Sequence, residues 1–262
     1  MVMPQSFSMN TSTFTPATWA LLFAAAFLQG LSKGGMPGVS ILAIPLVAMV
    51  IPGKAASGMI LPMLILGDVF ALAHWHRSAS WRDLRHALPW AVAGIVAGTV
   101  LLGRIDDRLM RPIIGWIVLL ILLIHVYRLY LAPGKPGANP LEHPLRRRAL
   151  AACMGTLGGF TTMLANAAGP VMTMHFLARR LPKETFLGTS AWFFFLINWI
   201  KVPIMLHLHM ITLPSLKVNL LMTPALLIGV AAGVFIVRRI NQQSFDLAVT
   251  LLTALACVRL LL

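Results

Sequence analysis

Acidic residues are scarce in this chain of 262 residues, and charged residues of either sign are few. Seven Asp and Glu stand against 21 Lys and Arg, and 11% of the residues are charged whereas 58% are hydrophobic. A soluble domain carries roughly 25% charged residues, so this chain has too few to cover its surface in water. Several apolar stretches approach the ~20 residues that cross a bilayer core. Because unpaired backbone groups are costly in lipid, the composition predicts an all-α polytopic membrane protein.

Cysteine is also scarce, and the common catalytic signatures are absent from the sequence. The two cysteines, Cys153 and Cys257, lie in apolar segments, and neither belongs to a CxxC or Cys/His metal spacing. The sequence contains no Walker motif, nucleophile elbow, HExxH or GxGxxG. We therefore expect no enzyme activity, no metal site and no cofactor.

The excess of basic residues gives a formal net charge of +14, which in a soluble protein would suggest nucleic acid. Here the basic residues cluster between apolar runs and are not interleaved with aromatic residues. That distribution is typical of a membrane protein that follows charge bias and attracts anionic lipids. The expected partner is a lipid bilayer, and nucleic acid is not expected.

Clusters of charge, Pro and Gly divide the chain into two similar halves. We expect a polar tail over residues 1–16, a first membrane repeat over 17–131, a basic Pro/Gly linker over 132–148 and a second repeat over 149–262. Each repeat has an interrupted apolar element followed by three fuller spans. Glycines recur in the same order at offsets of 125 to 135 residues: Gly30 with Gly155, Gly34 with Gly159, Gly58 with Gly188, Gly94 with Gly229, and Gly98 with Gly233. This colinear order predicts a duplication.

The two repeats are expected to be inverted relative to each other. If each interrupted element forms a hairpin, each repeat crosses the membrane an odd number of times. With the linker inside, the basic clusters at residues 77–85, 179–183 and 238–239 are also inside, as charge bias requires. The cluster at residues 104–111 falls outside, where two aspartates offset part of its charge. The predicted fold is two inverted repeats, each a broken or hairpin helical element plus three transmembrane helices, an architecture typical of secondary transporters.

The first interruption reads GLSKGGMPGVS over residues 30–40. A helix that restarts inside the membrane exposes N–H groups, and these groups and the helix dipole favour an anion. Gly34 and Gly35 let the backbone approach a ligand closely, and Lys33 adds a full positive charge. The alternative is that the glycines and the proline merely kink a packed helix while Lys33 snorkels to the interface.

The second interruption lies near TTMLANAAGP. Thr161, Thr162 and Asn166 offer hydroxyl and amide groups there, and Gly169 with Pro170 restarts a helix. Because the two interruptions occupy matching places in the repeats, they could enclose one small anion from opposite sides.

Three polar residues in predicted spans are further candidates, because ionisable groups inside a membrane are costly and usually functional. Asp68 lies in the interior of a span, and its repeat partner, 130 residues later, is Asn198. Lys201 lies on the same helical face as Asn198, so both could donate to an anion unless Lys201 snorkels. Asp68 is either a proton-coupling group or, as we favour, the counter-charge that keeps a lysine ionised.

Several segments resemble the sulfite exporter TauE/SafE family, also called the toluene sulfonate uptake permeases. They include GLSKGGMPGVSILAIPLVA and TTMLANAAGPVMTMHFLARRLPKETFLGTSAWFFFLINWIKVPI, and the resemblance runs from about Thr18 to the end of the chain. It implies a multi-pass permease of the bacterial inner membrane for sulfite, a sulfonate, sulfoacetate or a similar small anion. Carried over by motif, the binding candidates are Lys33, Gly34, Gly35, Asn166, Gly169, Asn198 and Lys201, with Asp68 secondary. Many relatives have a run of glycines where this chain has Ser32 and Lys33, which leaves the exact anion open.

The predicted function is secondary-active transport of this anion by alternating access around the two interrupted elements. A passive anion channel with the same lining and a non-transporting membrane assembly factor are the alternatives. The direction of transport, the coupling ion (H⁺ or Na⁺) and the oligomeric state stay open.

Overall fold

A computed structural model describes residues 14–37, 39–50, 53–102, 116, 119–120, 123 and 144–261. Outside these residues lie most of the predicted N-terminal tail, most of residues 103–131 at the end of the first predicted repeat, and the linker as far as residue 143. The basic cluster at residues 104–111 is among them. Gly38 in the first interruption also lies outside the described residues.

The regular elements of the described segments are all helical, which confirms the all-α prediction. They are α1 (Pro16–Gly34), α2 (Ser40–Val50), α3 (Gly53–Trp75), the 3-10 turn η2 (His76–Ser78), α4 (Trp81–Leu102), α6 (Pro144–Ala165), α7 (Ala168–Ala178), α8 (Lys183–His207), α9 (Leu213–Arg239) and α10 (Gln242–Leu261).

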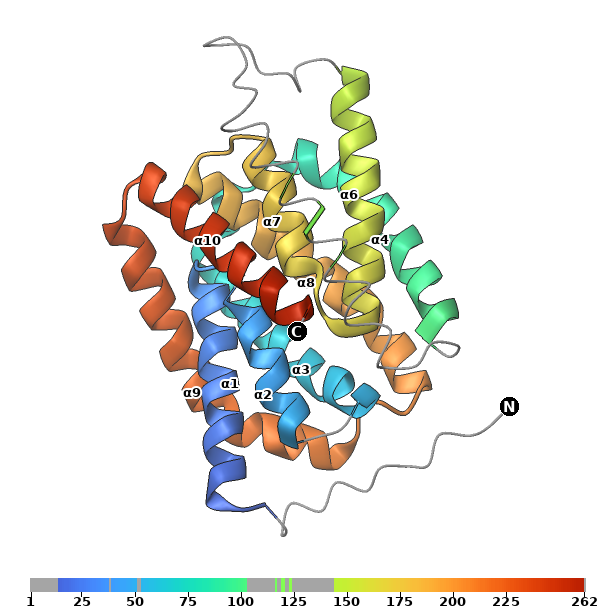
Figure 1. The fold of residues 1–262 in the computed structure, drawn as a ribbon, viewed down its shortest axis with the longest axis vertical. Helices are drawn as coiled ribbons and strands as arrows, with labels where there is room; N and C mark the ends of the chain where they lie inside the picture. The colour runs from blue at the N-terminus through green and yellow to red at the C-terminus, as the bar shows by residue number, and fades with distance from the viewer. Residues whose placement is uncertain are drawn as a thin grey trace.

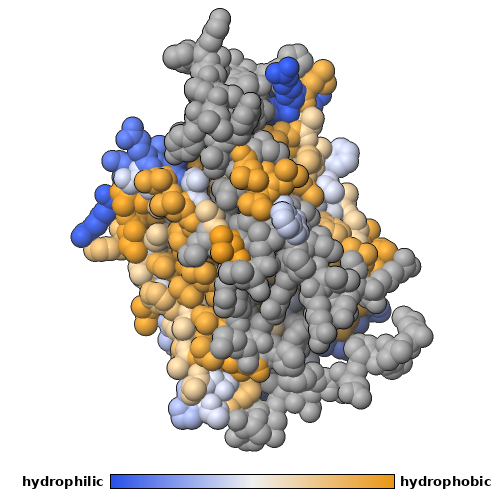
Figure 2. Space-filling model, viewed as in Figure 1, coloured by the Kyte–Doolittle hydropathy of each residue, from blue (hydrophilic) through white to orange (hydrophobic). Residues whose placement is uncertain are grey.

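Four segments are long and apolar enough to cross a membrane, which indicates a multi-pass membrane protein. They are Ala56–Ser78, Trp81–Leu102, Lys183–His207 and Leu213–Arg239. Large hydrophobic side chains on α9, such as Leu220 and Ile228, are exposed, as is expected where a helix faces lipid. Figure 2 shows this hydrophobic surface on the left of the molecule, between hydrophilic groups toward its upper and lower ends.

Both interruptions are real breaks between helices. The first separates α1 from α2 and the second separates α6 from α7; α2 and α7 have 11 residues each. At 1.5 Å per residue each is about 16 Å long, roughly half of a bilayer core. In Figure 1 α1 rises from the bottom toward the middle of the molecule, whereas α6 descends from the top toward the middle.

The boundaries differ from the predicted ones because helix geometry continues further into each interruption. Lys33 and Gly34 form the last turn of α1, which ends where Gly35 takes a φ of +142°. Thr161 and Thr162 lie within α6 rather than in the second break. Helix α6 begins at Pro144, so the basic end of the predicted linker is helical and the predicted start of the second repeat, residue 149, lies inside α6.

Glycines bring helices from different halves of the chain into backbone contact. Helix α1 packs on α9, where a Cβ on Gly30 would overlap the carbonyl oxygen of Leu226. Helix α6 packs on α4, where a Cβ on Gly159 would overlap the carbonyl oxygen of Ala91. Small residues allow such close approach between membrane helices. In each half, the helix that precedes the break therefore packs on a later or earlier helix of the other half: α1 on α9, and α6 on α4.

Helices α3 and α8 pack against each other in antiparallel orientation between these two pairs. Gly58, near the start of α3, contacts Met210 just beyond the end of α8. Gly188, near the start of α8, contacts Trp75 at the end of α3. The two glycines are 130 residues apart and were paired by the repeat pattern. This crossing brings the middle of α3 and the middle of α8 next to both breaks.

Candidate functional site

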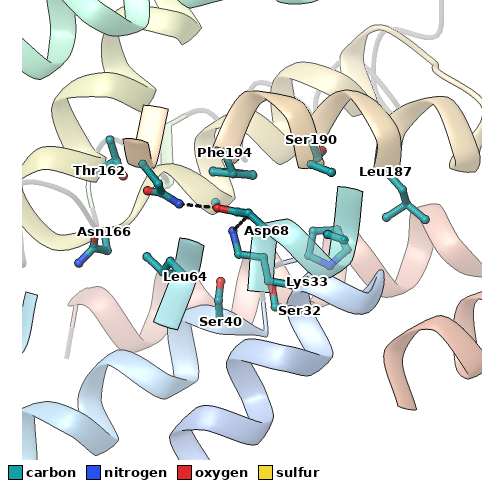
Figure 3. A pocket seen from close by; sticks show the side chains of 15 residues that line it. Ser32, Lys33, Ser40, Leu64, Asp68, Thr162, Asn166, Leu187, Ser190 and Phe194 are labelled. Atoms are coloured by element: carbon teal, nitrogen blue, oxygen red, sulfur yellow. Dashed lines mark hydrogen bonds and ion pairs between the residues drawn. The ribbon is translucent and has the colours of Figure 1, made fainter. Parts of the chain in front are cut away.

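Asp68, on α3, contacts polar groups of two other helices where α3 and α8 pack together. The side chain is completely buried, and its Oδ1 accepts a hydrogen bond from Lys33 Nζ over 2.5 Å. Its Oδ2 accepts from Asn198 Nδ2 over 2.7 Å. Figure 3 shows Lys33 and Asp68 pointing toward each other. Both carboxylate oxygens are thus engaged, and the geometry is that of a counter-charge to Lys33.

Lys33 reaches Asp68 from the end of α1 because its surroundings guide the side chain. The stem of Lys33 passes over Gly67, where a Cβ would come within 2.9 Å of Lys33 Cγ. The ammonium also lies 4.6 Å from the centre of the Phe194 ring, within the range of a cation–π contact. Trp75 Nε1 donates to the carbonyl oxygen of Gly34 and so fixes the end of α1.

Lys201, on α8, is fully buried and does not reach the interface as a snorkelling lysine would. Its Nζ donates to Asn166 Oδ1 over 2.7 Å and to Thr162 Oγ1 over 3.0 Å. A longer contact of 3.4 Å runs to the carbonyl oxygen of Thr162. Its partners are therefore neutral oxygens of Thr162, in α6, and of Asn166, at the second break. Lys201 itself does not line the pocket described below.

Asn166 ties the second break to its neighbours. Its backbone has a φ of +52°, a left-handed conformation that asparagine tolerates better than most residues. Its Nδ2 donates to Ser57 Oγ over 2.9 Å and to the carbonyl oxygen of Ser57 over 3.0 Å. Since Oδ1 accepts from Lys201, the side-chain amide bridges α3 and α8 and holds the break in place.

A pocket of about 50 Å³ opens beside these groups, between the two breaks. At roughly 10–15 Å³ per water molecule this holds a few waters or a comparably small polar group. The polar residues that line it are Ser32, Lys33, Ser40, Asp68, Thr162, Asn166, Ser190 and Asn198. The other lining residues are Pro37, Leu64, Ala71, Gly169, Leu187, Ala191 and Phe194. Figure 3 shows the labelled members of this set around the pocket.

The start of α7 also borders the pocket. Its N-cap residue, Ala167, makes no side-chain cap hydrogen bond, so the first N–H groups of α7 receive no such acceptor. A Cβ on Gly169 would meet only Ser40 Oγ, at 3.6 Å, which leaves the backbone open toward the pocket. Such a helix start favours an anion.

Besides Lys201, three predicted binding residues lie away from the pocket. A Cβ on Gly34 would overlap the carbonyl oxygen of Val230, so this glycine serves the packing of α1 on α9. A Cβ on Gly35 would lie 2.8 Å from Val237 Cγ2. Thr161 Oγ1 donates back to the carbonyl oxygen of Leu157 over 2.8 Å. These residues shape the breaks rather than face the pocket.

The structure also adds residues that the sequence analysis missed. Ser32 and Ser40 flank the first break and line the pocket. Ser190 and Phe194 line it from α8, two turns and one turn before Asn198. Their spacing of four residues places all three on one helical face, and this spacing was the available signal. No group of three or more potential metal ligands occurs among the described residues.

One comparison with known proteins finds a match. The family model described as Sulfite exporter TauE/SafE matches residues 21–260, nearly the whole chain. No curated protein and no solved structure matches.

Proposed function

The chain belongs to the sulfite exporter TauE/SafE family, and we propose that it is a secondary-active transporter for a small sulfur-containing or organic anion. Sulfite, a sulfonate and sulfoacetate are the candidate substrates. The family is one of membrane transporters, which agrees with the four membrane-capable helices. We infer that the protein resides in the bacterial inner membrane.

The observation that carries the proposal is the pocket between the two helix breaks. Charged groups inside a membrane are costly and are usually retained for function. Here Lys33 and Asp68 line a small cavity together with hydroxyl and amide groups, and the uncapped start of α7 adjoins it. A scaffold protein has no need for such a polar interior.

Within this site the residues have different roles. Lys33, Asn198 and the backbone near Gly169 bind the anion, and the pocket serines add hydroxyl donors. Asp68 holds Lys33 when the site is empty. Lys201 and Thr162 position Asn166, and thereby the start of α7, rather than touching the substrate themselves.

We further propose that the two halves are inverted repeats and that the site opens alternately to either side. The opposite directions of α1 and α6 and the antiparallel crossing of α3 and α8 support this. The glycine-packed pairs α1–α9 and α4–α6 then act as two units that rock about the α3–α8 crossing, as in other transporters with discontinuous helices.

The test is transport by the purified protein in proteoliposomes with an imposed H⁺ or Na⁺ gradient. We expect a labelled sulfite or sulfonate to accumulate above its external concentration, which a passive channel cannot achieve. Lys33→Met should abolish the accumulation, whereas Lys217→Met, at an exposed lysine of α9, should not. Downhill flux alone would identify a channel, and the absence of any flux with all the anions would favour the assembly factor.

A further inference from the structure

We propose that the pocket is built for a singly charged anion, and that a doubly charged anion binds only together with one proton taken up by Asp68. This inference rests on the proposed function, since it concerns the anion site of the transporter. It names the charge class of the substrate and the residue that couples the binding of a dianion to a proton.

The charges around the pocket do not balance when it is empty. Lys33 and Asp68 neutralise each other as an ion pair. Lys201 is fully buried, and its hydrogen-bond partners are the neutral oxygens of Thr162 and Asn166. In the part of the chain that the structure describes, Lys33–Asp68 and Arg179–Asp83 are the ion pairs. When Lys201 is protonated, the site therefore carries one uncompensated positive charge.

Among the described residues, no further titratable group corrects this balance. The other acidic and basic side chains described in α3, α6, α7 and α8 do not line the pocket: His74, Arg146, Arg147, Arg148, His175, Lys183, Glu184 and His207. Lys33 from α1 and Lys201 from α8 face Asp68, and α2 carries no titratable residue. The titratable side chains of η2 (His76 and Arg77) and of α9 (Lys217, Arg238 and Arg239) do not line the pocket.

An unpaired buried charge is costly in a medium of low dielectric constant. A monoanion such as a sulfonate brings the net charge of the site to zero, so its binding removes that cost. A dianion such as sulfate leaves one negative charge in excess. Because Lys33 can turn from Asp68 toward the incoming anion, the carboxylate that it leaves is the group free to accept a proton, and this proton restores neutrality.

The experiment compares methanesulfonate with sulfate, two small tetrahedral anions that differ by one charge. Calorimetric titration of the purified protein, in chloride-free buffers with different ionisation enthalpies, counts the protons taken up. We expect no proton with methanesulfonate and about one with sulfate, so that sulfate affinity falls about tenfold per pH unit whereas methanesulfonate affinity does not change.

Two variants change the net charge of the site in opposite directions. Asp68→Asn adds one net positive charge, so sulfate should now bind without proton uptake. Lys201→Gln removes one, so methanesulfonate should now bind with about one proton. Thermal unfolding of both variants with and without each anion reports whether they are folded.

The outcomes separate this inference from the proposed function. If both anions bind to the unaltered protein with the same proton count, the charge-balance inference is overturned while the anion site stands. If neither anion, nor sulfite, binds or stabilises the protein, the anion site and this inference both fail. If Asp68→Asn takes up as many protons with each anion as the unaltered protein does, the proton goes to another group. That result would also overturn the inference.

Discussion

Asn198 donates a hydrogen bond to Asp68 over 2.7 Å, and the two residues are 130 residues apart, which makes them equivalent positions of the two proposed repeats. Equivalent positions of two repeats related by a two-fold axis can touch only near that axis. The contact therefore lies where such an axis would pass, at the crossing of α3 and α8. If the two halves are the inverted repeats that we propose, the difference between the two residues, an acid and an amide, makes the centre between them chemically asymmetric.

Removing the carboxylate at this centre should destabilise the protein. Asp68→Leu leaves the ammonium of Lys33, whose side chain is 11% exposed, without its ion-pair partner. Removing one partner of a buried ion pair costs about 3–5 kcal/mol, and we expect a lower midpoint of thermal unfolding in detergent.

The double variant Lys33→Met with Asp68→Leu provides the control, because it removes both charges. It should recover most of the lost stability but no transport. A double variant as unstable as Asp68→Leu would show that the pair does not act as a unit.

Gly67 should control the position of Lys33 without holding the fold together. In Gly67→Ala the new methyl group presses on the flexible Lys33 side chain, because its carbon would lie 2.9 Å from Lys33 Cγ. We expect weaker anion binding, measured by thermal shift or calorimetry, and unfolding close to that of the unaltered protein.

Gly30→Ala is the matched comparison, because its methyl group meets the backbone of α9 rather than a side chain. Overpacking of this kind costs about 1–3 kcal/mol, so this variant should lose stability. If Gly67→Ala were the less stable of the two, the proposed role of Gly67 would be wrong.

Asn166 should be replaceable by glycine at a lower cost in stability than by alanine. Both substitutions remove the side-chain bridge from Ser57 to Lys201, but only glycine adopts the φ of +52° without strain. We expect Asn166→Ala to be less stable than Asn166→Gly by about 1–2 kcal/mol, measured by thermal or denaturant unfolding. Equal stabilities would mean that the left-handed turn relaxes in the variant. Both variants should transport poorly, because Lys201 loses an acceptor and the start of α7 loses its support.

Much of the fold was accessible from the sequence because its signals are local. Apolar runs predicted the helices, and Gly/Pro clusters predicted both breaks. The paired glycines marked helix contacts such as those of Gly30 and Gly159, since only glycine permits that approach of backbones.

The partners of the two lysines were not accessible in this way. The sequence offered one buried acid and two candidate lysines, and either could have paired with Asp68. Lys33 is the partner because its side chain passes over Gly67 and so reaches Asp68. This contact joins residues far apart in the chain, and sequence spacing does not reveal it. Similarly, Thr161 and Thr162 are adjacent in the chain, but only Thr162 lines the pocket. Their roles depend on the rotational phase of α6, which the predicted boundary of the break did not fix.

The inversion of the repeats predicts that the ends of α3 and α8 face opposite sides of the membrane. Arg77, just after α3, and His207, the last residue of α8, are exposed and are 130 residues apart. Each is to be replaced by cysteine in a chain with Cys153→Ser and Cys257→Ser. An impermeant maleimide added to intact cells should label His207→Cys at once, and Arg77→Cys only after the membrane is permeabilised, because the basic cluster around Arg77 is held inside. Labelling of both positions from one side would contradict the inversion of the repeats and the antiparallel packing of α3 on α8. The pocket would then lack the two-sided geometry that alternating access needs, even if it binds an anion.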